Sequence, residues 1–207
     1  MTNKDDYNFT KDWFAWAPDV WMQVLPLLPA RKDFLEIGSY EGRSAVWMAE
    51  NFAEDGARIL CVDTWQGGEE HANEDMKEVE FRFDYNIATS HARFPDRRIE
   101  KRKRSSYVAL TSLAATTDTF DFIYLDGSHV AKDVLTDACL AWPLLKPGGV
   151  MVFDDYLWGG DGDIQKLLRR PKLAVDAFVN IFAGEVVFAS IGYQMIIRKR
   201  PEEKKAR

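Results

Sequence analysis

Acidic side chains directly follow two apolar runs of this 207-residue sequence. Asp126 comes after residues 120–125, and the pair Asp154-Asp155 comes after residues 150–153. Carboxylates at neighbouring strand ends are unfavourable unless they are solvated, paired or bound to a cation. Oxygen ligands suit a hard cation such as magnesium, and no set of His and Cys residues points to zinc. We therefore predict a metal site at these three aspartates, with solvation and helix capping as the alternative.

His129 lies three residues after Asp126, where a turn at a strand end would bring both side chains toward one cleft. Imidazole titrates near neutral pH and can accept the proton of a hydroxyl group. His129 and Asp126 are accordingly the predicted catalytic residues. A structural histidine is the alternative at this position.

A glycine-containing turn occupies residues 36–44, Glu-Ile-Gly-Ser-Tyr-Glu-Gly-Arg-Ser. Gly38 and Gly42 let the backbone turn tightly, and the helix that follows would direct its first N–H groups at a polar ligand. The dinucleotide fingerprint Gly-x-Gly-x-x-Gly has no acid ahead of it, whereas Glu36 stands two residues before Gly38. This carboxylate would repel a pyrophosphate and attract an amino group. A purely structural strand-to-helix turn is the alternative.

Two further strand ends carry polar residues. Asp63 suits hydrogen bonds to ribose hydroxyls, as in NAD enzymes, and Trp65 would either cover an adenine face or pack in the core. Ser105 and Ser106 follow a third strand-like run, and their hydroxyls would reach an adenine edge, cap the next helix, or both.

The elements that would position these residues alternate along the chain. Strand-like runs alternate with segments of helical periodicity, which favours parallel strands joined by right-handed crossovers. Such sheets bind ligands beyond the carboxyl ends of their strands, where the polar residues lie. The expected strands are residues 34–38, 58–63, 98–104, 120–125 and 150–153, and the expected helices are residues 13–28, 43–52, 76–88, 107–114 and 130–145.

The C-terminal end departs from this alternation. Residues 186–190 and 193–198 are strand-like, with only Ile191-Gly192 between them. A gap this short permits a hairpin and no crossover, so an antiparallel pair is expected to finish the sheet. Pro147-Gly148-Gly149 is expected to end the helix before the strand at 150–153.

Composition indicates a single soluble globular domain, with 46% hydrophobic and 29% charged residues. The net charge of −6 argues against bulk binding of polyanions. Cys61 and Cys139 lie in apolar runs and are expected to be buried, without a zinc or disulfide pattern. Because no run has the length of a membrane span and the polar N-terminus is unlike a signal peptide, a cytoplasmic location without a membrane partner is expected.

Together these motifs resemble the motif series of class I S-adenosylmethionine-dependent methyltransferases, most of all the methyltransferase domain 24 family. The resemblance covers roughly residues 33–199 and includes the Leu-Leu-Lys-Pro-Gly-Gly segment at residues 144–149. It implies an α/β fold with a Rossmann-like, doubly wound, seven-stranded sheet, mostly parallel with an antiparallel C-terminal strand. Residues 1–30 would form a helical extension of this single domain, and residues 201–207 a charged tail.

The resemblance also implies S-adenosyl-L-methionine as the cofactor. Glu36 would lie below its methionine part, Asp63 would hold its ribose, and Ser105 and Ser106 would lie beside its adenine. The expected cofactor-binding residues are Glu36, Gly38, Ser39, Tyr40, Glu41, Gly42, Ser44, Asp63, Thr64, Trp65, Ser105, Ser106, Asp126 and Gly127.

The family is similar to catechol-type and macrolide-sugar O-methyltransferases. Metal-dependent relatives have ligands at the positions of Asp126, Asp154 and Asp155, and a base at the position of His129. Catechol-type enzymes commonly have Asp-Asn in place of Asp154-Asp155 and often a lysine base, whereas macrolide-sugar enzymes agree better with His129. The implied reaction is Mg²⁺-assisted methylation of a small-molecule hydroxyl, on a catechol or a sugar.

A small molecule is therefore the expected partner. Residues 67–75 with Trp13, Trp16 and Trp21 are expected to form a substrate lid, and an exposed aromatic N-terminal helix would suit a homodimer.

Three other function classes are alternatives. A nicotinamide oxidoreductase requires Gly-x-Gly-x-x-Gly and a parallel final strand. A nucleic-acid-modifying methyltransferase finds support in a basic cluster, although Lys and Arg on an outer strand also discourage edge-to-edge pairing. A non-catalytic cofactor-binding protein is the third. The basic cluster comprises Arg97, Arg98, Lys101, Arg102, Lys103 and Arg104.

Overall fold

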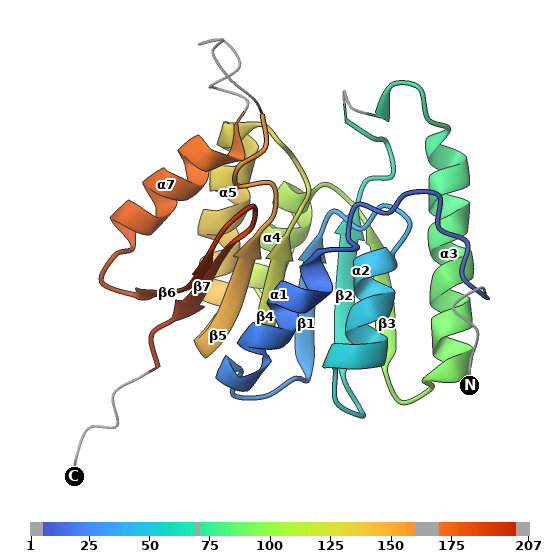
Figure 1. Cartoon of the computed structure of the whole chain (residues 1–207), viewed down its shortest axis with the longest axis horizontal. Helices are drawn as coiled ribbons and strands as arrows, with labels where there is room; N and C mark the ends of the chain where they lie inside the picture. Colours follow the sequence, from blue (N-terminus) through green and yellow to red (C-terminus); the bar gives the residue numbers. More distant parts are fainter. Residues whose placement is uncertain (1–5, 69–70, 160–169, 202–207) are drawn as a thin grey trace.

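The computed structural model describes residues 6–68, 71–159 and 170–201. Within these residues a seven-stranded sheet has the order β3-β2-β1-β4-β5-β7-β6, with helices on both faces (Figure 1). The strands are β1 (Asp33–Ile37), β2 (Arg58–Asp63), β3 (Arg98–Lys103), β4 (Phe120–Leu125), β5 (Leu145–Phe153), β6 (Val186–Ile191) and β7 (Met195–Lys199). The helices are α1 (Ala17–Val24), α2 (Arg43–Trp47), α3 (Met76–Arg93), α4 (Ser106–Ala114), α5 (Ala131–Ala141) and α7 (Pro171–Ile181), with short helical turns at Leu25–Leu27, Met48–Phe52 and Trp142–Leu144.

The sheet has the predicted mixed topology. β1 pairs in parallel with β2 on one side and with β4 on the other. β2 also pairs in parallel with β3, and β4 pairs in parallel with β5. β7 is antiparallel to both β5 and β6, so the Rossmann-like fold with an antiparallel C-terminal hairpin is confirmed. Because β7 runs opposite to β5, the β6–β7 turn lies at the carboxyl end of β5, where Asp154 and Asp155 follow.

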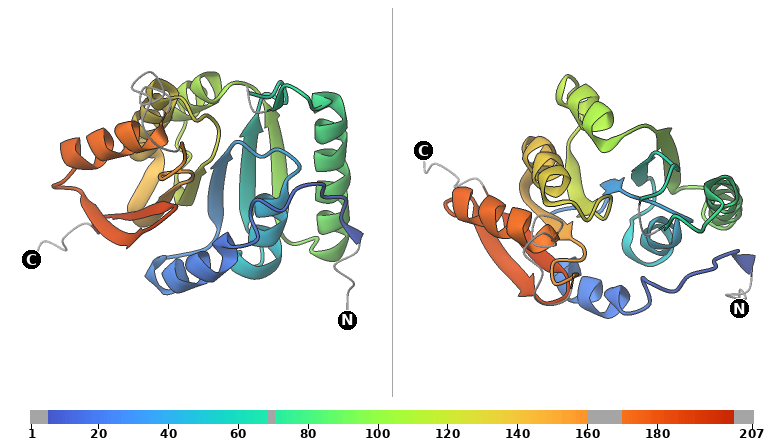
Figure 2. Two further views of the ribbon diagram at one scale, coloured as in Figure 1. Left: turned by 45° about the horizontal axis from the view of Figure 1, so that its top comes forward. Right: turned by 90° about the horizontal axis from the view of Figure 1, so that it is seen from above.

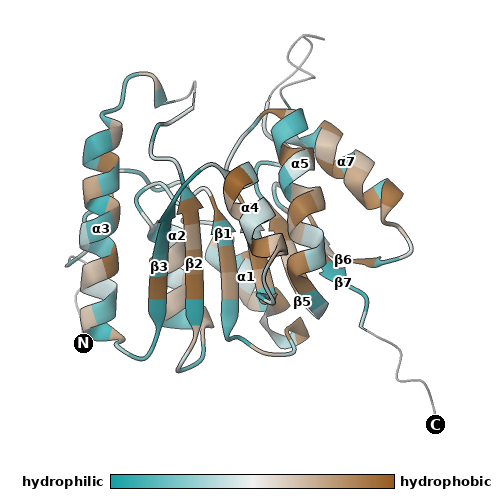
Figure 3. Ribbon diagram, turned by 180° about the vertical axis from the view of Figure 1, so that it is seen from behind, coloured by the Kyte–Doolittle hydropathy of each residue, from teal (hydrophilic) through white to brown (hydrophobic). Residues whose placement is uncertain are grey.

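The central strands are buried on both faces because helices cover each side. In β1, Leu35 and Ile37 belong to the core cluster that contains α4, α5 and α7, and Phe34 belongs to the cluster that contains α1, α2 and α3. Burying one such side chain stabilises the fold by about 1.5–3 kcal/mol. Figure 3 shows these hydrophobic central strands beside the hydrophilic edge strand β3.

The basic cluster lies on and beside β3, at one edge of the sheet. Lys101 is 2.8 Å from both Glu80 and Asp84 of α3, and Lys103 also pairs with Glu80. Acidic residues of the same surface thus balance much of the cluster's charge. This arrangement agrees with protection of an edge strand.

The N-terminal segment is part of the main core. Residues 6–16 run over α2 toward α3 (Figure 2), and the backbone N–H of Asn8 donates to Asn86 of α3 at 2.7 Å. Trp21 is fully buried and donates from Nε1 to Gln194 at 2.8 Å. The prediction that Trp21 belongs to a lid is therefore wrong. The dimer prediction is based on an exposed aromatic N-terminal helix, and in the structure the Trp21 ring of this helix is buried.

The helix expected over residues 130–145 is shorter. α5 ends at Ala141, since Pro143 has no N–H for a further helical bond, and a short helical turn leads into β5. Pro147-Gly148-Gly149 lies inside β5 and does not end a helix. The register of β5 on β4 shifts there, from Phe120↔Leu145 to Phe122↔Val150.

The two cysteines differ in exposure. Cys61 of β2 is buried as predicted, whereas Cys139 is exposed on α5. Cys139 follows the fully buried Ala138, and one residue turns a helix by about 100°. The prediction for Cys139 is therefore wrong.

Asp137 of α5 gives a stability prediction. Burial raises its pKa to about 6 despite a hydrogen bond with Ser106. A carboxyl whose pKa is raised on folding stabilises the fold below its unfolded pKa near 4, and this contribution is lost as the pH rises through 6. Asp137→Asn should therefore unfold like wild type at pH 4 and be roughly 1–3 kcal/mol more stable at pH 8. Urea unfolding at both pH values checks this, and equal stability at pH 8 would contradict it.

Candidate active site

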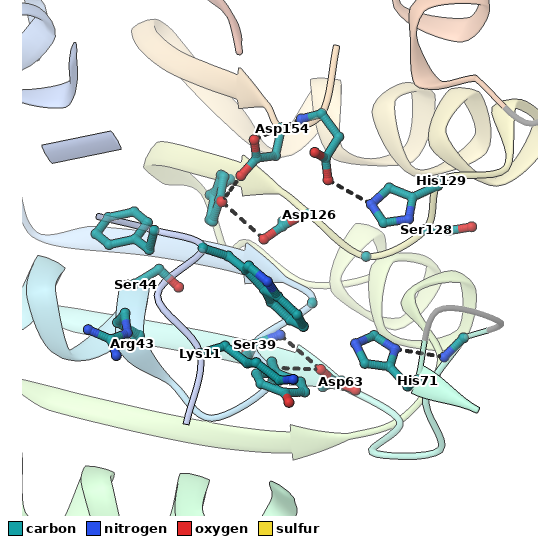
Figure 4. Close-up of a pocket in the computed structure, with 18 of the residues that line it drawn as sticks. Lys11, Ser39, Arg43, Ser44, Asp63, His71, Asp126, Ser128, His129 and Asp154 are labelled. Atoms are coloured by element: carbon teal, nitrogen blue, oxygen red, sulfur yellow. Dashed lines mark hydrogen bonds and ion pairs between the residues drawn. The ribbon is translucent and has the colours of Figure 1, made fainter. Parts of the chain in front are cut away.

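A large pocket opens at the carboxyl ends of β1, β2, β4 and β5, with a cavity volume of about 1190 Å³ (Figure 4). This volume suffices for a cofactor together with a small substrate. Twelve of the predicted site residues line it: Gly38, Ser39, Tyr40, Glu41, Ser44, Asp63, Thr64, Asp126, Gly127, His129, Asp154 and Asp155.

Other predicted residues lie away from the cavity. Trp65 is buried and packs on Phe83, with ring centroids 4.7 Å apart, so of its two alternatives the structure shows packing. Ser105 caps α4 by accepting a hydrogen bond from the backbone N–H of Val108, and Ser106 bonds Asp137. Gly42 is also absent from the pocket lining; it is the residue before α2, where its φ of 80° forms part of the tight turn.

Asp63 holds the turn between β1 and α2. Its Oδ2 accepts hydrogen bonds from the backbone N–H groups of Ser39 (2.9 Å) and Tyr40 (3.0 Å), and its Oδ1 accepts one from Trp65 (2.7 Å). An ionised carboxylate accepts several bonds, so Asp63 can shape the turn and still face the pocket. Tyr40 and Trp65 both have positive φ, which shows how tightly these turns are bent.

Glu36 lies beneath the same turn in β1. Its side chain is fully buried and accepts a hydrogen bond from Ser44 of α2. Burial raises the pKa of this carboxyl, although Ser44 opposes the shift. A cationic group placed above the turn would favour the ionised form.

The Tyr124 hydroxyl lies between two acidic residues of the pocket floor. It is 3.0 Å from Oδ2 of Asp126 and also contacts Oδ2 of Asp154. Burial and the charge of Asp154 raise the pKa of Asp126 well above its usual range, although its side chain is open to the cavity. Burial and the charge of Asp155 raise the pKa of Asp154 to about 6.

His129 contacts the third aspartate. Its Nε2 is 2.6 Å from Oδ2 of Asp155, and its ring stacks on Trp158 with centroids 4.4 Å apart. Nδ1 of His129 is buried, so Nε2 is the nitrogen that can exchange a proton with a ligand. Asp155 has a φ of 52°, a left-handed conformation that residues other than glycine seldom adopt.

A divalent cation fits this cluster. Donor atoms of Asp126, His129 and Asp155 all lie within 4.8 Å of one another. Asp154, part of the predicted ligand set, instead points to Tyr124 and accepts a bond from the backbone N–H of Asp155 at 2.7 Å. Two carboxylates with one imidazole suit a hard or borderline divalent ion.

The outer wall comes from two segments that the sequence predicts as a lid. Trp13 and Trp16 line the pocket, as do Gly67, Gly68 and His71. The Trp13 ring lies 5.0 Å from that of Tyr40 and 6.0 Å from that of His71. These contacts join the N-terminal segment to the β1–α2 turn. Residues 69 and 70 of the predicted lid lie outside the described residues.

Sequence reasoning misses several pocket residues, including Tyr124, Trp158 and Tyr193. Tyr193 has a usable signal: it stands in the hairpin turn that the topology returns to the carboxyl end of β5. Tyr124 has a weaker signal, since an aromatic residue inside a buried strand is usually part of the core. Trp158 follows β5 closely, but no spacing rule selects it.

Comparison with known proteins decides the family. Residues 35–156, more than half of the chain, match the family model for the methyltransferase domain. The chain belongs to the methyltransferase domain 24 family, a class I, S-adenosylmethionine-dependent family. Demethylmacrocin O-methyltransferase of Streptomyces fradiae is 41% identical to this chain over 61 residues, covering 26% of the chain and 15% of the relative. A protein of Acanthamoeba polyphaga mimivirus, R132, is 30% identical over 128 residues, covering 59% of the chain and 51% of the relative. The chain thus spans about half or less of the length of these relatives.

Solved structures share the fold of this chain. MycE methyltransferase from the mycinamycin biosynthetic pathway, in complex with Mg and SAH, has a TM-score of 0.60 at 19% identity, covering 96% of this chain and 53% of its own. TomG of Streptomyces achromogenes is an O-methyltransferase of tomaymycin synthesis, solved in complex with SAM. It has a TM-score of 0.64 at 20% identity, covering 90% of this chain and 81% of its own. Within the part of the chain that the structure describes, no helix is long and apolar enough to cross a membrane.

Proposed function

We propose that this protein transfers the methyl group of S-adenosylmethionine to a hydroxyl oxygen of a small molecule, a catechol or a sugar. The observation that carries the proposal is the pairing, in one pocket, of the Asp63-held turn with the Asp126–His129–Asp155 cluster. The first suits a nucleoside cofactor, and the second suits a hydroxyl that must lose its proton. The names of similar proteins support oxygen as the acceptor atom.

Different residues of the pocket would bind the cofactor, accept the proton and cover the acceptor. Asp63 and the backbone of Ser39 and Tyr40 would hold the ribose and methionine parts of the cofactor, whose sulfonium supplies the methyl group. Nε2 of His129 would leave its hydrogen bond with Asp155 and take the acceptor's proton, because Nδ1 is buried. Trp13, Trp16 and Trp158 would cover the acceptor and exclude water. Bringing both reactants into one enclosure supplies much of the rate.

A divalent cation would be held by Asp126 and Asp155, with Asp154 beside them, which leaves Nε2 of His129 for the proton; the cation would lower the pKa of an acceptor hydroxyl. Its positive charge would also relieve the repulsion among the three carboxylates.

Tritiated methyl transfer from S-adenosylmethionine to a panel of catechols and sugars tests the proposal, with Mg²⁺ and with EDTA. We expect transfer to at least one vicinal diol, a loss of activity of about 100-fold or more in His129→Gln, and unchanged S-adenosylhomocysteine affinity in that variant. Transfer only to nucleic acid or to amino groups would contradict the proposal.

Magnesium binding should depend on pH. Burial raises the pKa of Asp154 to about 6 and also raises that of Asp126, so both carboxyls bind protons at low pH, and a cation beside them favours their ionised forms. We therefore expect Mg²⁺ affinity to rise by about ten-fold or more between pH 5.5 and 7.5, with protons released on binding. Calorimetry in buffers of different ionisation enthalpy measures both quantities. Affinity that is constant over this range would contradict the assignment of these carboxylates.

A further inference from the structure

Tyr193 lies in the β6–β7 turn, outside all motifs of the family resemblance. Its hydroxyl donates a hydrogen bond to Oδ1 of Asp155 at 2.7 Å. The other oxygen of the same carboxylate is 2.6 Å from Nε2 of His129. Asp155 is thus held from two sides, by a tyrosine on one oxygen and by the predicted base on the other.

Asp155 needs such support because its backbone alone does not fix it. A residue held in the left-handed region, as Asp155 is at a φ of 52°, persists only where its surroundings hold it. A carboxylate that must keep one orientation is commonly fixed by a second hydrogen-bonding group outside the set that touches the ligand.

The turn that carries Tyr193 is itself anchored by the N-terminal segment. The Tyr193 ring packs edge-on against Trp16, with centroids 5.3 Å apart. The neighbouring Gln194 accepts the Trp21 Nε1–H at 2.8 Å and is 2% exposed. Both tryptophans come from the segment that also walls the pocket, so the position of the Tyr193 hydroxyl is set by packing on two sides.

We propose that Tyr193 is a positioning residue of the methyl-acceptor end of the pocket, where it fixes Asp155 and, through Asp155, His129. This inference rests on the proposed function, because it concerns the base and one candidate ligand of that reaction. The ring of Tyr193 packs on Trp16 and its hydroxyl alone reaches Asp155, so Tyr193→Phe removes the positioning bond and keeps the packing.

The test compares Tyr193→Phe with Tyr107→Phe, a matched control on the exposed face of α4. The sequence has three histidines, so a ¹⁵N imidazole spectrum contains three sets of signals, and His129→Gln identifies that of His129. The same proteins are titrated calorimetrically with S-adenosylhomocysteine, and then with Mg²⁺ in its presence. Thermal unfolding monitors folding of each variant.

In Tyr193→Phe we expect the His129 signals to move toward those of a free imidazole while the His71 and His91 signals stay in place. The Mg²⁺ dissociation constant should rise by about ten-fold, the S-adenosylhomocysteine dissociation constant should stay within about two-fold, and Tyr107→Phe should change none of these. Unmoved His129 signals would overturn the inference, and so would movement of all three signals with a lowered unfolding temperature, which indicates a general structural role. Wild-type protein that binds no S-adenosylhomocysteine would refute the proposed function, and the imidazole spectrum would still decide the role of Tyr193.

Discussion

Gly38→Ala is expected to prevent stable folding. Gly38 has a φ of +84°, and a Cβ built on it would lie 2.0 Å from the backbone oxygen of Asp126. The clash is with backbone, so no side-chain rotation relieves it, and the two turns that form the floor of the pocket would have to separate. We expect a loss of at least about 4 kcal/mol in the free energy of unfolding, measured by urea denaturation, or failure to obtain folded protein.

Gly184→Ala is the matched control for this prediction. A Cβ at Gly184 meets nothing within 4 Å, so the same chemical change should shift stability by no more than about 0.5 kcal/mol. A folded Gly38→Ala protein with stability close to that of the control would show that the β1–α2 and β4–α5 turns do not approach as described.

Asp63→Ala is expected to weaken S-adenosylhomocysteine binding by about 100-fold or more. The substitution removes the acceptor of three backbone N–H groups, so the turn over the cofactor loses its shape, and it also removes the carboxylate predicted to hold the ribose. Hydrogen bonds to a charged group contribute about 1.5–3 kcal/mol each, and 1.4 kcal/mol is a factor of ten in affinity. Calorimetric titration measures the change.

Two variants control the Asp63 experiment. Asp63→Asn keeps one acceptor oxygen and should bind S-adenosylhomocysteine with intermediate affinity. Asp84→Ala removes a carboxylate on α3 outside the pocket lining and should bind within about two-fold of wild type. Wild-type affinity in a folded Asp63→Ala protein would contradict the role given to this residue.

Sequence reasoning succeeds where strand order determines position. The acids and glycines that follow β1, β2, β4 and β5 meet in one pocket because the carboxyl ends of parallel strands share an edge. The hairpin turn at Gly192 likewise identifies the antiparallel end of the sheet, because a short connection leaves no other topology.

It fails where packing chooses between equally good local roles. Trp65 and Trp21 are large aromatic residues close in sequence to residues that line the pocket, yet both rings are buried in the core. Ser105 is a good helix cap as well as a possible adenine contact, and the structure shows the cap. Pro147-Gly148-Gly149 lies within β5, because α5 has already ended at Ala141, just before Pro143. Local patterns do not contain the long-range contacts that make these choices.

The predicted metal ligands are a further case in which spacing does not determine contacts. Asp126, Asp154 and Asp155 are adjacent in the topology, but which oxygen faces the cavity depends on Tyr124, Tyr193 and His129. None of these contacts follows from the spacing of the acids.

Calorimetric titration of the wild-type protein with S-adenosylhomocysteine tests the central claim most directly. The pocket described here predicts one site per chain with a micromolar dissociation constant, competed by S-adenosylmethionine and not by NAD. Absence of binding heat at millimolar S-adenosylhomocysteine, with the protein folded, would contradict the assignment of this pocket to the methyl-donor cofactor.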